Sequence, residues 1–242
     1  MSYFAFMQKK PILIAIAAGA VVAMFLLARI TGVIQFYTIS TSSNMPTLAV
    51  GELIFSTNLK HIERNRFIFF QQYDSLMKKK AFWTHRCVGL PGDTLQMKNG
   101  VLYVNGKQGA VENKVWRLYT LYTGRPDYWV ARFKDRFKEH DQQWLLPLDS
   151  LMQVPLTLLE AARMPSGLQA AESLAPADAS GFTPYYFAGL QQSGWTVDNF
   201  GPLVVPAASY FVLGDYRHNA MDSRYIGLIH QSAVKGVAIS DQ

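Results

Sequence analysis

The feature that most constrains this chain is an uncharged, largely apolar run near its start. The run extends over 18 residues from Pro11 to Ala28, and scattered apolar residues continue beyond Arg29. A helix of about 20 apolar residues spans the hydrocarbon core of a bilayer, and a long arginine side chain near the helix end can reach the interface. The sequence therefore predicts one transmembrane helix over residues 11–34.

The charges on either side of this run predict the orientation of the chain. Lys9, Lys10 and the amino terminus make the N-terminal side the more positive one, although Arg29 weakens the asymmetry. The positive-inside rule then makes residues 1–10 a cytoplasmic tail and places the rest of the chain outside. A cleaved signal peptide is the alternative, since small residues occur within the run. The run is long for such a peptide, however, and no clear cleavage site follows it.

The net charge of +6 does not indicate a nucleic-acid partner. Three of these charges come from Lys9, Lys10 and Arg29 around the apolar run, and the rest of the chain is close to balance. This distribution favours the lipid bilayer, and not nucleic acid, as the partner of the basic residues.

Cysteine and histidine usage predicts a domain without disulfides, metals or cofactors. Cys87 is the one cysteine among the 242 residues, so no internal disulfide can form. The sequence contains no Cys-x-x-Cys or His-Glu-x-x-His pattern and no glycine-rich phosphate loop, which are signatures of metal and nucleotide sites. An exported domain of this length is expected to rely on its hydrophobic core.

Short β-branched and aromatic runs on both sides of a long middle segment predict a mainly β domain built from two parts of the chain. The first part covers residues 36–107 and the second covers residues 201–242. The pair Asn99-Gly100, between two such runs, is typical of a type I′ hairpin turn. The expected strands lie at residues 53–55, 66–70, 101–104, 210–213 and 234–239.

The middle segment, residues 108–200, is expected to be an inserted α+β cap. An aromatic residue at every fourth position between charged residues predicts an amphipathic helix, and a stretch of small residues near the end is typical of a linker. The expected elements are a helix within residues 128–140, a second helix over residues 156–164 and a linker over residues 165–182.

Three segments outside the cap are richer in glycine, proline and polar residues than strands require. Residues 40–47 contain a cluster of hydroxyls, residues 85–93 begin with a histidine, and residues 214–224 form an acidic turn with two aspartates. A hydroxyl, a histidine and a carboxylate are the components of a nucleophilic hydrolase. Each segment alone is more often a structural turn, so the interpretation depends on their joint occurrence.

Together, and in this order after an apolar anchor, the three segments resemble the type I signal peptidases, which are membrane-bound serine proteases. The most specific matches are residues 86–93, 210–215 and 222–227. The resemblance implies a signal-peptidase-like β-domain with an inserted α+β cap after one transmembrane helix. It also implies a single-pass protein of the bacterial cytoplasmic (inner) membrane with its catalytic domain outside the cytoplasm. Its substrates would be signal-peptide-bearing preproteins cut after small residues, and no cofactor is implied.

In that family the nucleophile is the serine of a Ser-x-x-Pro-Thr motif, which falls here on Ser43. The family's oxyanion hole combines the backbone N–H of the nucleophile with a hydroxyl two residues earlier, here Thr41. Such a donor is worth a few kcal/mol of transition-state stabilisation. The resemblance also assigns Ile39 and Leu48 to the small S1 and S3 pockets. Asn44 replaces the methionine that usually follows the nucleophile at the edge of the substrate pocket.

The general base is the larger departure from the family. Most bacterial members have a lysine where this chain has His85, and the serine that usually holds the lysine is replaced by Ala220. A histidine can accept the serine proton near pH 7, but it needs an acceptor on its other nitrogen. Asp222 is the first candidate for that acceptor and Asp215 the second. The signal peptidases of the endoplasmic reticulum and of archaea are similar here, so we predict a Ser43–His85–Asp222 triad.

Three alternatives to this prediction stay open. A lysine from residues 78–80 could replace the missing base, although Lys80 lies at an odd offset from His85 and so faces the other side of a strand. The chain could instead be a catalytically inactive, membrane-anchored binding or scaffold homologue. A cytoplasmic repressor of related fold is disfavoured by the anchor. The altered base and the insertion also suggest a specialised peptidase that serves conjugative transfer or pilin maturation.

Overall fold

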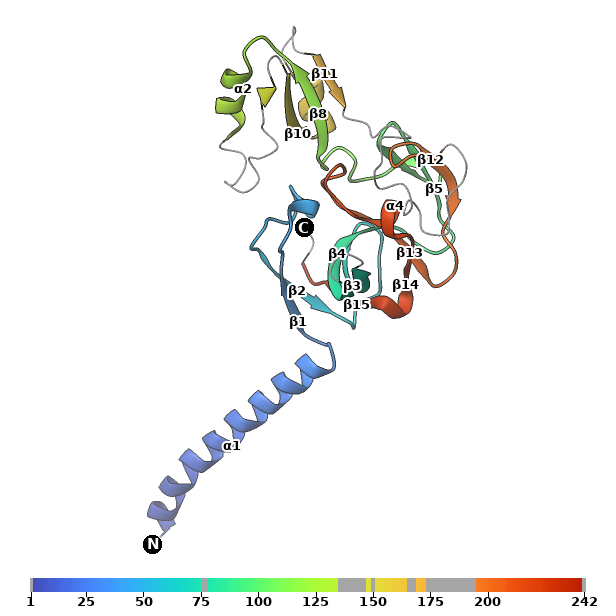
Figure 1. Ribbon diagram of the computed structural model, residues 1–242. Coiled ribbons are helices and arrows are strands. Elements are labelled where there is room, and N and C mark those ends of the chain that lie inside the picture. Colours follow the sequence, from blue (N-terminus) through green and yellow to red (C-terminus); the bar gives the residue numbers. More distant parts are fainter. Residues whose placement is uncertain are drawn as a thin grey trace.

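A computed structural model describes residues 2–74, 78–134, 147–148, 151–164, 169–172 and 195–240. Its first element is the helix α1 (Ser2–Ile30), which projects away from the rest of the molecule (Figure 1). The stretch Ile12–Ile30 has a mean hydropathy of 2.4, and none of it is buried against other parts of the protein. The helix is long and apolar enough to cross a membrane, which supports a membrane anchor.

The helix ends at Ile30 and not at the predicted boundary of residue 34. Gly32 adopts a positive φ of 79°, a backbone conformation that commonly terminates helices and that glycine adopts most readily. The chain then enters the strand β1 (Gln35–Thr38). The anchor therefore leads directly into the sheet that carries the candidate site.

Both parts of the predicted β-domain join in one seven-stranded sheet, in the order β1-β2-β15-β3-β4-β13-β14. The C-terminal strand β15 pairs with β2 on one side and with β3 on the other, in antiparallel fashion. Segments from the two ends of the chain are therefore held together by backbone hydrogen bonds. The other strands of this sheet are β2 (Leu53–Thr57), β3 (Phe67–Asp74), β4 (Lys79–Gly89), β13 (Ser209–Leu213), β14 (Ile229–His230) and β15 (Val234–Ala238).

A second sheet of four strands has the order β12-β5-β6-β7 and again combines both parts of the chain. The turn between β5 and β6 contains Asn99 and Gly100, with positive φ angles of 47° and 75°. Two positive φ angles are what a type I′ turn requires, so the predicted hairpin is confirmed. The strands are β5 (Thr94–Lys98), β6 (Val101–Val104), β7 (Lys107–Gln108) and β12 (Phe200–Val204).

Apolar clusters cover both faces of β3, which explains its continuous run of hydrophobic residues. Ile68 and Phe70 pack in one buried cluster, while Phe69 packs in another together with Ile39 and Leu48. The last two residues flank the loop of the predicted nucleophile. That loop is therefore fixed to the hydrophobic core from both of its ends.

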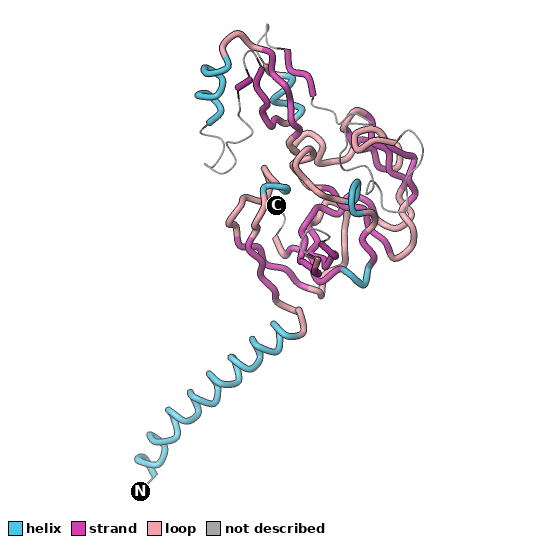
Figure 2. Tube along the Cα trace, in the orientation of Figure 1, coloured by secondary structure: helices cyan, strands magenta, loops and turns pink. Residues whose placement is uncertain are grey.

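A third sheet, in the order β11-β8-β10-β9, forms the cap together with two helices. The cap lies apart from the seven-stranded sheet, at the end of the molecule away from α1 (Figures 1 and 2). Its elements are β8 (Arg117–Tyr122), α2 (Pro126–Phe133), β9 (Pro147–Leu148), β10 (Leu151–Leu156), α3 (Leu158–Ala162) and β11 (Gln169–Glu172).

The structure corrects the bounds of some elements that the sequence predicted within the cap. The first helix already begins at Pro126, and its predicted residues after position 134 lie outside the described part of the chain. The second helix begins at Leu158, because Thr157 and Glu160 form a reciprocal capping box there. The predicted linker contains the strand β11, whose backbone pairs with β8. The rest of the linker lies outside the described residues.

Candidate active site

The predicted nucleophile lies in the loop after β1, within the short 3₁₀ helix η1 (Ser42–Asn44). Ser43 is half-buried, and its Oγ lies 3.0 Å from Oγ1 of Thr41. The backbone N–H of Tyr216 donates a hydrogen bond of 3.0 Å to the carbonyl oxygen of Ser43. The segment 214–224, which we call the acidic loop, is thereby attached to the nucleophile loop.

His85 lies on β4 and is buried, with 2% of its surface exposed. Its Nδ1 is 3.2 Å from Oδ1 of Asn44, and its Nε2 is 3.1 Å from the backbone oxygen of Met221. Burial is the largest influence on the ring and lowers the pKa of His85 below its ordinary value, while the nearby Asp222 carboxylate partly opposes this. A ring that is neutral near pH 7 can accept a proton.

Ser43 and His85 meet around Gly214, the first residue of the acidic loop. A Cβ at this position would lie 2.5 Å from the carbonyl oxygen of Ser43 and 3.4 Å from Nδ1 of His85, and it would overlap Ala220. This close approach requires glycine. Within the described residues, the hydrogen bonds of His85 do not include the Ser43 hydroxyl, which contacts Thr41. The structure therefore gathers the two groups in one site without a direct hydrogen bond between them.

The predicted hydrogen bond between Asp222 and His85 is not formed, and this corrects the expected triad. The Asp222 carboxylate accepts hydrogen bonds from Nε of Arg224 at 2.9 Å, from a terminal nitrogen of Arg224 at 2.8 Å and from the N–H of Gly214 at 3.0 Å. It also caps the short helix α4 (Ser223–Ile226). A buried carboxylate needs such partners. They occupy both of its oxygens, so Asp222 acts on the ring through its charge.

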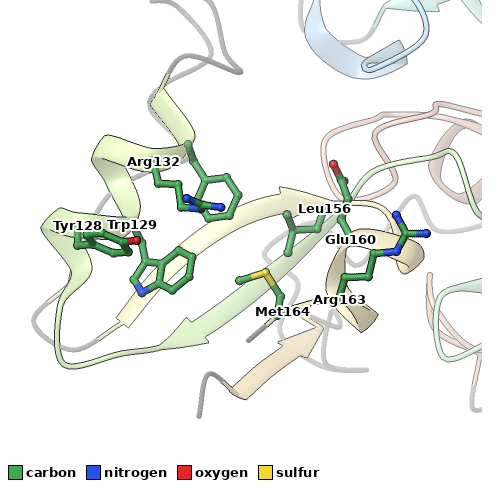
Figure 3. Close-up of a pocket in the computed structure, with 8 residues that line it drawn as sticks. Tyr128, Trp129, Arg132, Leu156, Glu160, Arg163 and Met164 are labelled. Carbon is green, nitrogen blue, oxygen red and sulfur yellow. The ribbon is translucent and has the colours of Figure 1, made fainter. Parts of the chain in front are cut away.

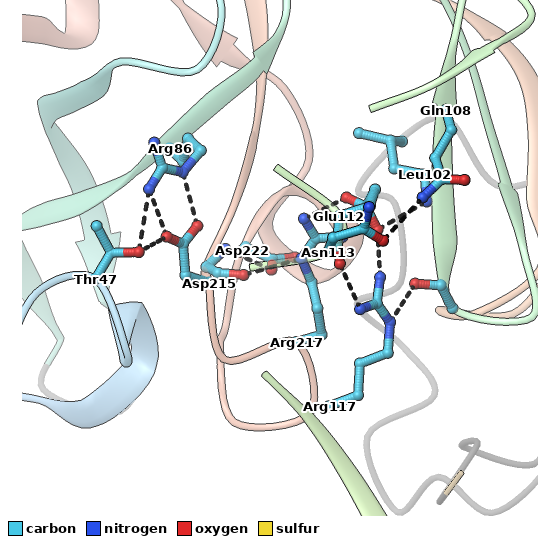
Figure 4. Close-up of polar contacts among 12 residues, drawn as sticks. Thr47, Arg86, Leu102, Gln108, Glu112, Asn113, Arg117, Asp215, Arg217 and Asp222 are labelled. Atoms are coloured by element: carbon cyan, nitrogen blue, oxygen red, sulfur yellow. Dashed lines mark hydrogen bonds and ion pairs between the residues drawn. The ribbon is translucent and has the colours of Figure 1, made fainter. Parts of the chain in front are cut away.

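Asp215, the second candidate for orienting His85, is also bound to an arginine (Figure 4). Arg86 donates to it from Nε at 2.8 Å and from a terminal nitrogen at 2.5 Å. The hydroxyl of Thr47, which belongs to the nucleophile motif, donates to the same carboxylate at 2.5 Å. Asp215 therefore joins the nucleophile loop to β4 and has no hydrogen bond to the ring.

A further buried ion-pair network, which no motif indicated, connects the start of the cap with the acidic loop (Figure 4). Glu112 accepts hydrogen bonds from Arg117 and, at 2.7 Å, from Arg217. All three residues are at most 1% exposed. The backbone N–H of Trp116 donates to the carbonyl oxygen of Asp215 at 2.8 Å. The first strand of the cap thus begins against the acidic loop.

The contact between Asn44 and His85 was also missed by the sequence prediction, which placed Asn44 at the edge of the substrate pocket. Asn44 is instead buried against the ring. The replacement of a methionine by a residue with an amide, at the position next to the nucleophile, was the signal available in the sequence. Ile39 and Leu48 are at most 5% exposed and belong to the core beneath the loop.

The three consecutive lysines considered as an alternative base, residues 78–80, are exposed near one end of β4. A strand rises about 3.3 Å per residue, so Lys80 and His85 are separated by roughly 17 Å along it. Lys80 pairs with Tyr73 of β3, close to the far end of the strand pair. This position gives no support to a lysine base at Ser43.

A pocket of about 370 Å³ lies in the cap, between α2, β10 and α3 (Figure 3). Tyr128 and Trp129 line it from α2, and Arg132 and Arg163 add positive charge. Its lining residues include none of those around Ser43, so the pocket is separate from the candidate active site. Among the residues that the structure describes, no three His, Cys, Asp or Glu side chains gather as a metal site would require.

Comparison with known proteins relates the chain to a family of peptidases. The family model of signal peptidase, peptidase S26, matches residues 12–240. A signal peptidase I from Bacillus amyloliquefaciens is 27% identical over 234 residues, which cover 95% of this chain and 80% of that protein. Signal peptidase I S from Bacillus subtilis (strain 168) is 26% identical over 234 residues, covering 95% and 84%. A crystal structure of a signal peptidase I from Enterococcus faecalis V583 aligns with 23% identity and a TM-score of 0.32, covering 74% of this chain and 97% of that chain.

Proposed function

The chain belongs to the signal peptidase family, peptidase S26, as a serine endopeptidase of the signal peptidase I type, and we propose that Ser43 and His85 carry its reaction. The main support is their convergence around Gly214. The half-buried Ser43 and a buried imidazole whose pKa is lowered both lie beside this glycine, and the hydroxyl of Thr41 lies 3.0 Å from Oγ of Ser43. Enzymes of this type remove signal peptides from preproteins.

In the proposed reaction, the Ser43 hydroxyl attacks the scissile carbonyl and His85 accepts its proton. A C–O bond forms while the carbonyl oxygen becomes an oxyanion. His85 then gives the proton to the leaving amine as the C–N bond breaks. A water molecule, deprotonated by the same ring, hydrolyses the acyl-enzyme and regenerates Ser43. Before the first step, the Ser43 hydroxyl must exchange its contact with Thr41 for one with the ring.

Thr41 and the backbone N–H of Ser43 are proposed to bind the oxyanion. The Thr41 hydroxyl lies beside Oγ of Ser43, and Thr41 is exposed, so a substrate carbonyl can approach it. When the Ser43 hydroxyl turns to the ring, the hydroxyl of Thr41 becomes available as a donor. A positioned donor of this kind lowers the barrier because its hydrogen bond strengthens as negative charge develops.

The membrane anchor is proposed to bring the site to substrates that lie in the same bilayer. The nucleophile loop follows α1 after a single strand, so the site is tethered close to the helix end. Lys9 and Lys10 support an orientation with residues 1–10 in the cytoplasm and the catalytic domain on the outer face of the cytoplasmic membrane. Ile39 and Leu48, buried beneath the loop, are proposed to shape the S1 and S3 pockets.

A specialised role, such as the maturation of pilins or of other subunits of a conjugative transfer apparatus, is a further part of the proposal. It is supported by the departures from the family pattern at His85, Asn44 and Ala220 and by the long insertion. Expression in cells depleted of their own signal peptidase tests it. We expect ordinary preproteins to stay unprocessed, and efficient restoration of their processing would contradict the specialised role.

The proposed function is tested by trapping the nucleophile with an acylating serine inhibitor. Intact-mass measurement of the full-length protein in detergent is expected to show one adduct, and Ser43→Ala is expected to show none. Ser42→Ala is the matched control, because it removes the neighbouring hydroxyl and should still be acylated. A folded protein that forms no adduct would favour the alternative, an inactive membrane-anchored binding or scaffold homologue.

A further inference from the structure

We propose that Asn44 positions His85 and determines which of its ring nitrogens carries the hydrogen. This is the role that the sequence assigned to Asp222. The inference rests on the proposed function, since it concerns the base of the same reaction. Asn44 is 2% exposed, and its amide contacts the His85 ring on one side and the backbone of Thr84 on the other.

The contact with Thr84 fixes the orientation of the Asn44 amide. Nδ2 lies 2.7 Å from the carbonyl oxygen of Thr84, and a carbonyl oxygen can only accept a hydrogen bond. Turning the amide over would place Oδ1 against this oxygen and leave two buried acceptors without a donor, which is costly. Oδ1 of Asn44 therefore faces Nδ1 of His85, and it can only accept.

Nδ1 of His85 can therefore bond to Asn44 only as a donor, and in the proposed arrangement the neutral ring carries its hydrogen there. In the neutral ring, Nε2 then keeps its lone pair and is the nitrogen that can accept a proton. Nε2 faces the backbone oxygen of Met221, which is also an acceptor. The neutral ring satisfies one of these two oxygens, whereas the imidazolium formed when Ser43 loses its proton satisfies both. Protonation therefore adds a hydrogen bond to Met221, which offsets part of the cost of placing a charge on the buried ring.

The charged groups around His85 show why an uncharged acceptor suits this position. Burial lowers the pKa of the ring most strongly, Asp222 and Asp215 raise it, and Arg224 lowers it. Asn44 orients the ring without adding a further charge. A carboxylate bonded directly to Nδ1 would raise the pKa and leave less of the ring neutral near pH 7.

Asn44 also supplies a contact that position 220 cannot make. Ala220 has no hydroxyl with which to hold a base, and its Cβ lies against Gly214. Asn44 directly follows Ser43 within η1, so one turn of backbone carries both the nucleophile and the acceptor for the base. Papain-like proteases provide a chemical precedent, because they combine a nucleophile and a histidine with an asparagine.

The first test is nitrogen NMR of the His85 ring in the full chain, with Ser43→Ala as the background. The ring of this protein is expected to carry its hydrogen on Nδ1 above its pKa. Asn44→Met should lower the pKa of His85 and shift the hydrogen to Nε2, where Met221 can accept it. Asn44→Asp should raise the pKa. Asn113→Met makes the same exchange at an exposed position and should change neither property.

Kinetics with an intact Ser43 provide the second test. Asn44→Met is expected to lower kcat/KM by about 100-fold, the usual cost of misplacing a reacting group, and to shift the acid limb of the pH profile to lower pH. Asn44→Asp should shift that limb to higher pH. An unchanged ring tautomer together with an unchanged pH profile would overturn the inference. If Asn44→Met does not fold, the direction of the shift in Asn44→Asp decides.

The two proposals fail in distinguishable ways. Full activity of Ser43→Ala or of His85→Ala would refute the proposed reaction. The ring tautomer, by contrast, is measured in a protein that lacks the nucleophile, so it tests the role of Asn44 without relying on cleavage.

Discussion

The two carboxylates of the acidic loop and the histidine beside them are all buried, but they are held by different kinds of partner. Asp215 is bound by Arg86 and Asp222 by Arg224, each through at least two hydrogen bonds. His85 is bound by an amide oxygen and a backbone oxygen, both uncharged. An arginine partner holds a carboxylate in place through charge-assisted hydrogen bonds, whereas neutral acceptors allow the ring to change its protonation state. We infer that the carboxylates build the site and that the ring exchanges protons.

This difference predicts where each substitution should have its effect. Removing one member of a buried ion pair costs about 3–5 kcal/mol, because an unpaired charge stays buried. A hydrogen bond between neutral groups contributes about 0.5–1.5 kcal/mol. Changes at the carboxylates should therefore lower stability above all, and changes at Ser43, Thr41 and His85 should lower the rate.

The largest effect is expected for His85→Ala. Loss of one member of a serine protease's catalytic set typically costs about 10⁴-fold or more in kcat, and a similar loss should appear in single-turnover cleavage of a signal-peptide substrate. Lys80→Ala is the control and should cleave like the wild type, since Lys80 is exposed near one end of β4. The reverse result, with an inactive Lys80→Ala and an active His85→Ala, would show that the base is misassigned.

The next largest effect is expected on stability, at the arginine-bound carboxylate of Asp215. Asp215→Asn leaves the Arg86 guanidinium buried without a carboxylate, so the free energy of unfolding in urea should fall by about 3–5 kcal/mol. Glu63→Gln breaks the pair with Arg66, in which the glutamate side chain is 65% exposed, and exposed pairs contribute about 0–1 kcal/mol. Equal losses of stability in the two variants would mean that the buried pair contributes no more to the free energy of unfolding than the exposed pair does.

A smaller effect is expected at the proposed oxyanion site. Thr41→Val removes one donor and should lower kcat by about 10²–10³-fold, the range found for such donors, with little change in stability because Thr41 is exposed. Thr41→Ser keeps the hydroxyl and should retain most of the activity. If Thr41→Val raised KM without changing kcat, Thr41 would be a substrate contact and would not stabilise the transition state.

Local patterns accounted for the elements that the sequence predicted well. The apolar helix, the strands on both sides of the cap and the Asn99-Gly100 turn each depend on neighbouring residues, and all three are present. The grouping of Ser43 with His85 followed from motifs in a fixed order. In the structure these motifs do converge around Gly214.

The choice of hydrogen-bond partner accounts for what was missed. Asp222 was a reasonable partner for His85 by its position in the motif, but Arg224, two residues away, binds it instead. Asn44 and His85 are 41 residues apart, and only the packing of η1 against β4 shows that they touch. A motif indicates which residues gather in a site, whereas the hydrogen bonds among them depend on directions that the sequence does not display.

The most direct test of the account is a comparison of two pH titrations, one of kcat/KM in the wild type and one of the His85 ring by NMR in Ser43→Ala. His85 works as a base only when it is neutral, and its pKa is lowered from 6.5. Activity should therefore rise with pH through a midpoint below 6.5 and level off above that midpoint, and the ring should titrate at the same midpoint. A rate that rises only at alkaline pH, while the ring titrates elsewhere, would contradict the assignment of His85 as the base.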